Sequence, residues 1–325
     1  MTRARFTCYA LVLAFLVFPA MAHAVLMEAS GTQSTSQYVT ITRTYSFFGT
    51  TALDVGNYIP FFRNTGSYDT YWRQTATHII SSQPTAVEVV PSGLGAWVFF
   101  GNVTNQTITV TIEGQVDVSV NLTGLSSDLA TASYGSEWCR GTVRCPTAIA
   151  GLNTTINNLW TASVPGTRSD TRAGFLERWE AWLSQSVAHV SGGDYEDQAA
   201  DRVYSMLAGN CSGFGNLFKS GCLVAPQPMA VGISGGWTLS GISTFQSSTN
   251  RLTLTTFDGP HGWNVVDGGS TWVPYDPFHN MMGMVTATRV LEYVAEDESD
   301  ASEILTYSYS GNFAPNVSIS SNVTR

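Results

Sequence analysis

The hydrophobic pattern of the chain changes its period twice, and this change limits the folds available to it. Between residues 25 and 125, β-branched and aromatic residues alternate with polar ones in several stretches separated by Gly, Pro, Ser and Asn clusters. Alternation with a period of two is typical of half-buried strands. The stretches are 37–48, 86–91, 95–101 and 106–122. Short strands at this spacing predict an N-terminal β-sandwich over residues 25–125.

The period becomes helical further along the chain. Apolar residues between 170 and 190 recur at intervals of three and four, which predicts an amphipathic helix. A second helix is expected over 196–207. Alternation then returns in stretches that predict strands at 229–233, 251–256, 261–266, 272–275, 286–293 and 304–309. Helices followed by strands predict an α+β second domain over 170–310, joined by a linker at 126–169 and followed by a polar tail at 311–325.

The first residues have the pattern of a secretory signal. A short basic run is followed by an apolar stretch from Tyr9 to about Ala20 and then by the small residues before Ala24. A transmembrane helix is the alternative, but the apolar run is short for a bilayer that needs about 20 residues. We expect cleavage after Ala24 or Ala22, which leaves about 301 residues (325 minus 24), enough for two domains. The mature protein is therefore expected to be exported, without a membrane span.

The composition of the chain limits the classes of binding partner that we expect. The net charge is −9 and only 12% of residues are charged, so the basic patch that nucleic acids require is not expected. A protein or peptide partner remains open, and the sequence assigns neither a cofactor, nor a metal, nor an oligomeric state.

Because the mature protein is expected to be exported, its cysteines are expected in an oxidising compartment, where disulfides form. Cys139 and Cys145 flank a five-residue loop, which predicts a local disulfide; a metal site there is the weaker alternative because no histidine lies nearby. Cys211 and Cys222 would be separated by about 16 Å along a helix, whereas a disulfide tolerates at most about 7 Å between Cα atoms. Cys211 is therefore expected to remain a thiol.

Cys211 lies where a loop is expected to become a helix, within the segment 209–218. Unpaired backbone N–H groups and the positive end of the helix dipole favour a thiolate at such a position. Small residues around it would let a substrate backbone approach. On this segment alone, a reactive nucleophile and a buried structural thiol are equally good interpretations.

A predicted hairpin supplies the second observation. The stretches 261–266 and 271–276 flank a turn at 267–270, so that His261 is expected to face Asp276 across the ladder. Such an aspartate would orient the imidazole and stabilise its protonated form. A one-residue slip in register would separate them, and a surface pair of little energetic value is the alternative.

These residues resemble the core motifs of the transglutaminase-like superfamily. Gly-x-Cys opens a helix at 209–211, His-x-Trp follows at 261–263, and Trp-x-x-x-Asp-Pro follows at 272–277. The resemblance covers residues 167–277 well, and relatives often carry a β-rich domain upstream. Ser212 and the segment 223–229 depart from the family pattern, which affects the shape of the pocket and leaves the three motifs intact.

The resemblance implies a papain-like triad. Cys211 would attack a carboxamide carbon, His261 would accept the thiol proton and later protonate the leaving amine, and Asp276 would orient His261. The oxyanion would be bound by the backbone N–H of Cys211 and a second donor, for which Tyr195 and His189 are weak candidates. The thioacyl intermediate would pass to water or to an amine, and exported relatives favour hydrolysis slightly.

The alternative function is a non-catalytic binding or surface-scaffold protein that keeps the fold. Asn-x-Ser/Thr acceptors begin at Asn102, Asn105, Asn121, Asn153, Asn210, Asn316 and Asn322. Because Asn210 adjoins Cys211, a glycan there would block the site, and we expect Asn210 to be unmodified.

Overall fold

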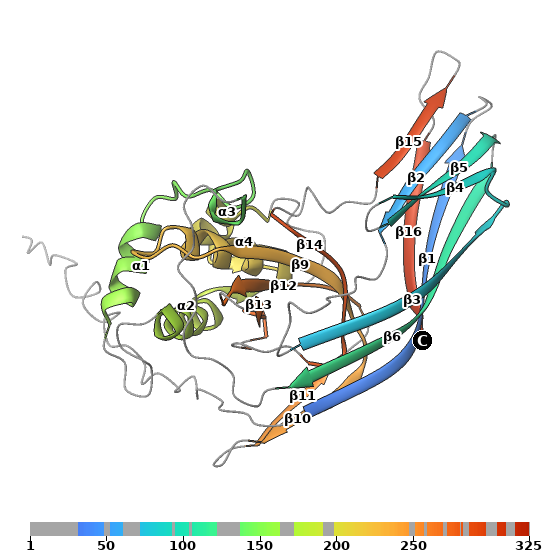
Figure 1. Cartoon of the computed structure of the whole chain (residues 1–325). Helices are drawn as coiled ribbons and strands as arrows, with labels where there is room; N and C mark the ends of the chain where they lie inside the picture. The colour runs from blue at the N-terminus through green and yellow to red at the C-terminus, as the bar shows by residue number, and fades with distance from the viewer. Residues whose placement is uncertain are drawn as a thin grey trace, which may run out of the picture.

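Antiparallel sheets form most of the protein, and helices cover one side of it (Figure 1). The computed structural model describes residues 32–48, 53–60, 72–92, 95–103, 106–121, 137–162, 172–190, 198–246, 251–256, 259–268, 272–279, 281, 286–296, 304–309 and 316–324. Within these residues there are three four-stranded antiparallel sheets and four α-helices. The predicted signal at 1–24 lies outside them. No helix in this part of the chain has both the length and the apolar character needed to cross a bilayer.

Two of the sheets combine strands from both ends of the chain. The first has the order β16-β1-β6-β3, with bounds Asn316–Thr324, Thr32–Phe48, Thr107–Asn121 and Trp72–Gln83. The second has the order β15-β2-β5-β4, with bounds Ile304–Tyr309, Leu53–Pro60, Gly95–Val103 and Glu88–Ser92. The predicted strands at 37–48, 86–91, 95–101 and 106–122 correspond to β1, β4, β5 and β6.

The C-terminal residues correct the predicted division of the chain. The region 311–325 was expected to be a polar tail, but β16 pairs with β1 along nine residues of each strand. The strand at 304–309 forms as predicted, but it pairs with β2 rather than with the strands that precede it. The pairing partner of a strand is set by tertiary contacts, which local alternation does not encode. Of the strands in these two sheets, β2, β3 and β16 were not predicted.

The third sheet carries the candidate site. Its order is β13-β12-β9-β14, with bounds Trp272–Tyr275, Gly259–Asp267, Val231–Thr238 and Arg289–Ala295. Two smaller sheets accompany it: β10-β11 at Gly241–Gln246 and Arg251–Thr256, and the parallel pair β7-β8 at Ala188–His189 and Ala208–Gly209. The helices are α1 Leu152–Thr161, α2 Arg172–Ser186, α3 Ala200–Met206 and α4 Cys211–Leu223. A 3-10 turn spans Glu137–Cys139.

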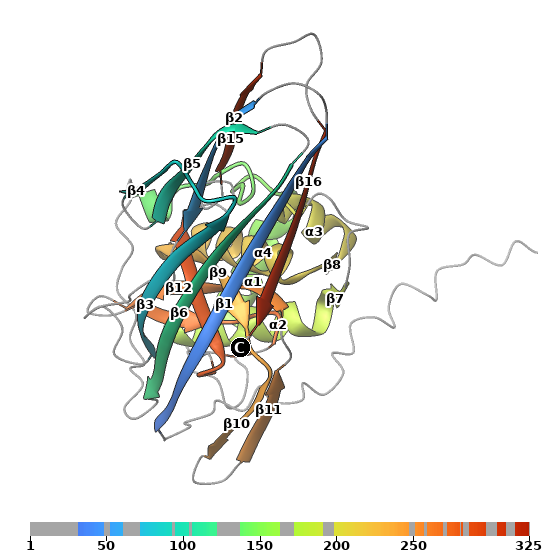
Figure 2. The ribbon, with the colours of Figure 1, turned by 90° about the vertical axis from the view of Figure 1, so that its right-hand side faces the viewer.

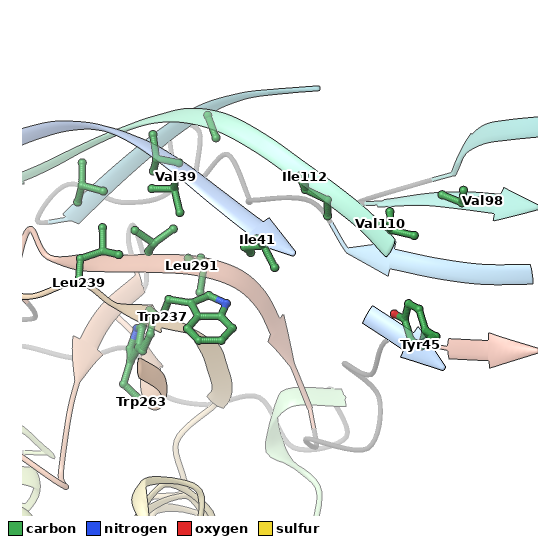
Figure 3. Close-up of a cluster of buried hydrophobic side chains, with 14 of the residues drawn as sticks. Val39, Ile41, Tyr45, Val98, Val110, Ile112, Trp237, Leu239, Trp263 and Leu291 are labelled. Carbon is green, nitrogen blue, oxygen red and sulfur yellow. The ribbon is translucent and has the colours of Figure 1, made fainter. Parts of the chain in front are cut away.

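The third sheet lies between two apolar cores. On one side, Trp237, Trp263 and Leu291 pack with Val39 and Ile41 of β1, together with side chains of β6 (Figure 3). Figure 2 shows the first sheet in front of β9, β12 and the helices. On the other side, Val231, Val266 and Val273 pack against α2 and α4. The N-terminal strands and the third sheet, which were expected to lie in separate domains, therefore share the first of these cores.

Buried polar contacts also join the first sheet to β14. Gln74 of β3 accepts a hydrogen bond from the backbone N–H of Leu291 and donates one to its carbonyl, both at 2.8 Å. This double contact is at the point where the β14–β9 register shifts, between Leu291 and Tyr293. Arg43 of β1 lies 3.5 Å from Glu292 with both side chains buried. The first sheet therefore fixes the position of the strand that begins with Arg289.

The helical core extends into the predicted linker at 126–169. Leu152 and Ile156 of α1 are fully buried against α2 and α4, so residues 152–161 are part of this core rather than a connection. The predicted helices at 170–190 and 196–207 correspond to α2 and to the shorter α3. Gly221 of α4 lies directly against the indole of Trp179, leaving no space for a Cβ atom.

We predict that Gly221→Ala destabilises the protein. The indole of Trp179 is fully buried and its Nε1 donates to the Phe218 carbonyl at 3.1 Å, so it cannot move aside. Overpacking of this kind costs about 1–3 kcal/mol, more than the gain of up to ~1 kcal/mol that alanine brings to a helix. Urea unfolding measures the difference. Gly259→Ala is the matched control, because a Cβ there meets no atom within 4 Å; equal losses in both variants would contradict the packing argument.

Candidate active site

His261 and Asp276 are joined by a short hydrogen bond. Nε2 of His261 lies 2.8 Å from Oδ2 of Asp276, and both side chains are buried. His261 belongs to β12, and Asp276 directly follows the last residue of β13. Two residues separated in the sequence by a hairpin are thus brought into direct contact.

The register of this hairpin differs from the prediction. Asn264 pairs with Tyr275 and Val266 with Val273, so the ladder is shifted by two residues from the one that would place His261 opposite Asp276. Side chains alternate between the faces with a period of two, and a shift of two keeps both residues on the same face. His261 and Asp276 are therefore diagonal neighbours in the ladder rather than directly opposite residues. Their side chains are long enough to span this diagonal separation.

Asp276 accepts hydrogen bonds from several donors. Besides His261, Nη2 of Arg289 lies 2.6 Å from Oδ2, and Nδ1 of His279 lies 3.1 Å from it. The backbone N–H of His279 donates to Oδ1 at 3.3 Å. Burial alone would raise the pKa of Asp276, but its electrostatic interactions with His261 and Arg289 and the hydrogen bonds from both histidines hold it well below its usual range. Asp276 is therefore an ionised carboxylate.

His261 is neutral at ordinary pH. Burial lowers its pKa, and Arg289 and His279 lower it further, against the opposing effect of Asp276. Because Nε2 faces the carboxylate, the proton of the neutral ring is placed on Nε2 by this hydrogen bond. Nδ1 is then the unprotonated nitrogen, which is able to accept a proton.

Cys211 is the first residue of α4, as predicted, and is half-buried. Asn210 caps the helix, because its side-chain oxygen accepts from the backbone N–H of Gly213 at 3.1 Å. Gln198 accepts from the backbone N–H of Asn210 at 3.0 Å, and a Cβ atom at Gly213 would collide with the side chains of Gln198 and Val203. The start of the helix is thus held by contacts on both sides.

The N-terminal half of α4 is held close to β12. Nδ2 of the buried Asn264 donates to the Gly215 carbonyl at 3.1 Å. Since β13 pairs only with residues 264–267 of β12, the edge of β12 at His261 is not covered by this strand. Phe278 lies at that edge, with its ring centroid 5.9 Å from His261 and 5.4 Å from Phe214 of α4.

His189 joins this aromatic group. It is paired with Gly209 in the β7-β8 sheet, and its ring is stacked on Phe278 at 4.2 Å and lies edge-on to Phe214 at 4.9 Å. Burial and the nearby His279 lower its pKa, although Asp276 opposes this. His189 was one candidate for the second oxyanion donor; the other, Tyr195, lies outside the described residues. The assignment of either residue as an oxyanion donor remains a prediction.

A metal ion does not fit this cluster. One ligand atom from each of His261, Asp276 and His279 lies within 4.8 Å of the others, which is the spacing of a three-ligand site. However, Nη2 of Arg289 lies 2.6 Å from the Asp276 oxygen and 3.1 Å from Nδ1 of His279. The guanidinium, which does not lose its proton in proteins, already occupies the cation position.

The expected disulfide between Cys139 and Cys145 is absent, and this prediction is wrong for the structure. None of the described cysteines is joined to another. Cys145 is buried and its Sγ lies 3.4 Å from Oδ1 of Asn216, so it points into the core beside α4 rather than across the loop. The loop is closed instead by Thr142, whose N–H donates to the Cys145 carbonyl at 3.2 Å and whose hydroxyl accepts from the Cys145 N–H at 3.0 Å.

Several residues of the site were not predicted. His279 lies three residues after Asp276, so its proximity was visible in the sequence. Phe278, Gln198 and Arg289 had no such signal, because nothing in their local pattern indicates a partner. Arg289 is the most important of them, since it is fully buried and paired with Asp276.

The comparisons with known proteins are limited to the fold. No protein-family model matches the chain, and no curated protein matches its sequence. One solved structure with a similar fold is that of a protein from Cytophaga hutchinsonii described as a "Putative Cysteine Protease". The match has a TM-score of 0.57 and 12% sequence identity, and covers 91% of this chain and 93% of the other. The likeness extends over both the N-terminal sheets and the helical part.

We predict that Glu180→Gln stabilises the protein increasingly as the pH rises. Glu180 of α2 is fully buried, and neither carboxylate oxygen has a hydrogen-bond partner among the described residues. Burial, and then the negative charge of Asp276, raise its pKa well above the usual value. A raised pKa in the folded state means that stability is lost as the pH rises above the pKa of the unfolded chain, about 4.3.

Thermal unfolding between pH 4 and pH 8 measures this effect. The difference in melting temperature between Glu180→Gln and the parent should be small at pH 4 and should increase towards pH 8, because glutamine has no proton to lose. Glu88→Gln, on the exposed edge strand β4, is the control. A difference that does not change with pH would show that Glu180 is not held in its neutral form.

Proposed function

We propose that this chain is an exported cysteine enzyme with a transglutaminase-like, papain-like core, joined to a β-rich part built from both ends of the chain, and acting on amide or isopeptide bonds of proteins or peptides. The observation that carries the proposal is the buried His261–Asp276 hydrogen bond at the edge of β12. Phe278 is a shared neighbour of His261 and of the first turn of the helix that begins with Cys211. The similar fold of the Cytophaga hutchinsonii protein supports the same class.

The proposed reaction uses each group in a distinct role. Sγ of Cys211 forms a bond to the carbonyl carbon of the substrate while its proton passes to Nδ1 of His261. Asp276 stabilises the resulting imidazolium through Nε2. The carbon–nitrogen bond then breaks, the amine leaves with the proton from Nδ1, and a thioester remains on Cys211. Water attacks this thioester in hydrolysis, with His261 taking its proton and returning it to the thiol.

The oxyanion of the tetrahedral intermediate lies near the start of α4 in this proposal. The first backbone N–H groups of a helix have no partner within the helix, and its dipole favours negative charge. The side-chain oxygen of Asn210 accepts from the backbone N–H of Gly213, and the backbone N–H of Cys211, at the start of the same helix, is the proposed oxyanion donor. A glycan on Asn210 would crowd this region, so we propose that this acceptor is not used.

We predict that Cys211 is alkylated rapidly by iodoacetamide near neutral pH and that His261→Ala slows this reaction tenfold or more. General-base assistance is typically worth about 10²–10⁴-fold, so a tenfold loss is a lower bound. The rate is followed by mass spectrometry of the peptide that carries residue 211. Cys222 is fully buried at the other end of α4, and burial raises its pKa, so it is the internal reference. Slow labelling that does not depend on His261 would favour the non-catalytic scaffold.

A second assay separates the two enzymatic outcomes. The protein is incubated with a glutamine-containing peptide and a labelled primary amine. We expect ammonia or cleaved peptide without incorporated label, which is hydrolysis. Incorporation of the label would show amine transfer, and Cys211→Ala is the control for background reaction. If Cys211 is alkylated rapidly but neither product forms, the substrate belongs to another class of acyl compound.

A further inference from the structure

Aromatic rings gather beside His261, and Phe278 is at their centre. The ring centroid of Phe278 lies 4.2 Å from that of His189, 5.0 Å from His279, 5.4 Å from Phe214 and 5.9 Å from His261. The rings of His261 and His279 are themselves 4.7 Å apart. We call His189, Phe214, Phe278 and His279 the aromatic cluster. Its members come from three segments of the chain, and it directly adjoins the histidine that is the proposed base.

The aromatic cluster also adjoins the segment that carries Cys211. Phe214 follows Cys211 by three residues in α4, and residues at this spacing are neighbours on one side of a helix. His189 pairs with Gly209 in the parallel β7-β8 sheet, two residues before Cys211. The cluster therefore extends from the strand of His261 to the start of the helix whose first residue is the proposed nucleophile.

Part of the aromatic cluster is open to solvent. Phe214 is fully buried beneath it, whereas Phe278 is half-buried and His189 and His279 are exposed. Burial and the nearby His279 lower the pKa of His189, although Asp276 opposes this, so the stacked His189–Phe278 pair is uncharged at neutral pH. An uncharged aromatic surface with an exposed part is suited to bind a planar apolar group.

A cationic ligand fits this surface less well than an uncharged ring. Aromatic faces attract cations, but the carboxylate beside the cluster, Asp276, is fully buried and already paired with Arg289. Nη2 of Arg289 also lies 3.1 Å from Nδ1 of His279, so a permanent positive charge adjoins the cluster itself. An uncharged ring avoids this repulsion and can add a stacked or edge-on contact, the two arrangements that the cluster already contains.

We propose that the aromatic cluster is a subsite for an aromatic side chain of the substrate, close to the carbonyl carbon that Cys211 attacks, and that Phe278 is its main specificity-determining residue. This inference rests on the proposed function and narrows its substrate class to peptides or other acyl compounds that carry a ring near the reacting group. His189 and His279 contribute the rest of the exposed ring surface.

The test compares alkylating reagents that differ only in the group on the amide nitrogen. Iodoacetamide, N-benzyl-iodoacetamide and N-cyclohexylmethyl-iodoacetamide react with the full chain, and each rate at Cys211 is divided by the rate of the same reagent with glutathione. In the parent protein, the benzyl reagent should react about tenfold or more faster than iodoacetamide, as expected for added apolar groups in an apolar site. It should exceed the cyclohexylmethyl reagent by about two- to tenfold, because ring–ring geometry adds to burial.

Variants assign this preference to the cluster. Phe278→Leu should abolish the advantage of the benzyl over the cyclohexylmethyl reagent, whereas Phe278→Tyr keeps the ring and should keep the advantage. If Phe278→Leu does not fold, His189→Leu is the second variant and should reduce the same ratio. Phe99→Leu is the matched control, because Phe99 of β5 is an exposed phenylalanine in another stacked pair, 6.1 Å from Trp97.

The outcomes separate this inference from the proposed function. Rapid reaction of the parent with iodoacetamide, but equal normalised rates with the benzyl and cyclohexylmethyl reagents, would overturn the inference and leave the cysteine enzyme intact. The inference also fails if Phe278→Leu slows all three reagents equally and keeps the benzyl advantage, since the ring would then only hold the turn at 276–279. If Cys211 in the parent is slow with every reagent and indifferent to His261→Ala, the proposed function fails, and the subsite fails with it.

Discussion

The ionised carboxylate of Asp276 is the group on which the arrangement of the site depends. It is fully buried, and a buried charge is tolerated only where opposite charge and hydrogen bonds replace water. Its partners come from β12, from the turn after β13 and from β14. One side chain therefore fixes three segments that the sequence separates. Removing any donor would leave part of the charge uncompensated, so these segments are coupled through electrostatics as well as through the sheet.

The N-terminal sheets contribute to the site through β14. The backbone of Leu291 is held by the Gln74 amide, and Glu292 lies beside Arg43. Arg289 lies at the beginning of the same strand, so contacts from β1 and β3 hold the strand that carries its guanidinium. The C-terminal strands β15 and β16 then return to the N-terminal sheets. The β-rich part is thus a structural support for the helical part rather than an independent attachment.

Local sequence patterns predicted the elements well and their partners poorly. The helix beginning at Cys211 and the strands β12 and β13 follow from capping, period and turn residues, which are local properties. The pairing of β15 with β2, and the contact between Arg289 and Asp276, depend on residues far apart in the sequence. For Cys139 and Cys145, local spacing predicted a contact that does not form. Their spacing permitted a disulfide, but Asn216 of α4 offers Cys145 a partner in the core that the spacing could not reveal.

The pairing of His261 with Asp276 shows why a partly wrong register still led to the correct contact. A ladder shifted by one residue would have moved one of the two side chains to the opposite face, where Asn264 and Val266 meet α4 and the helical core. The observed shift of two preserves the face, and the short strand β13 ends just before Asp276, so that the carboxylate extends towards His261 rather than remaining in the ladder. What the alternation of the sequence encodes is therefore the face on which the two residues meet. The exact partner is decided by Arg289 and the turn at 276–279, which bind the carboxylate from its other sides.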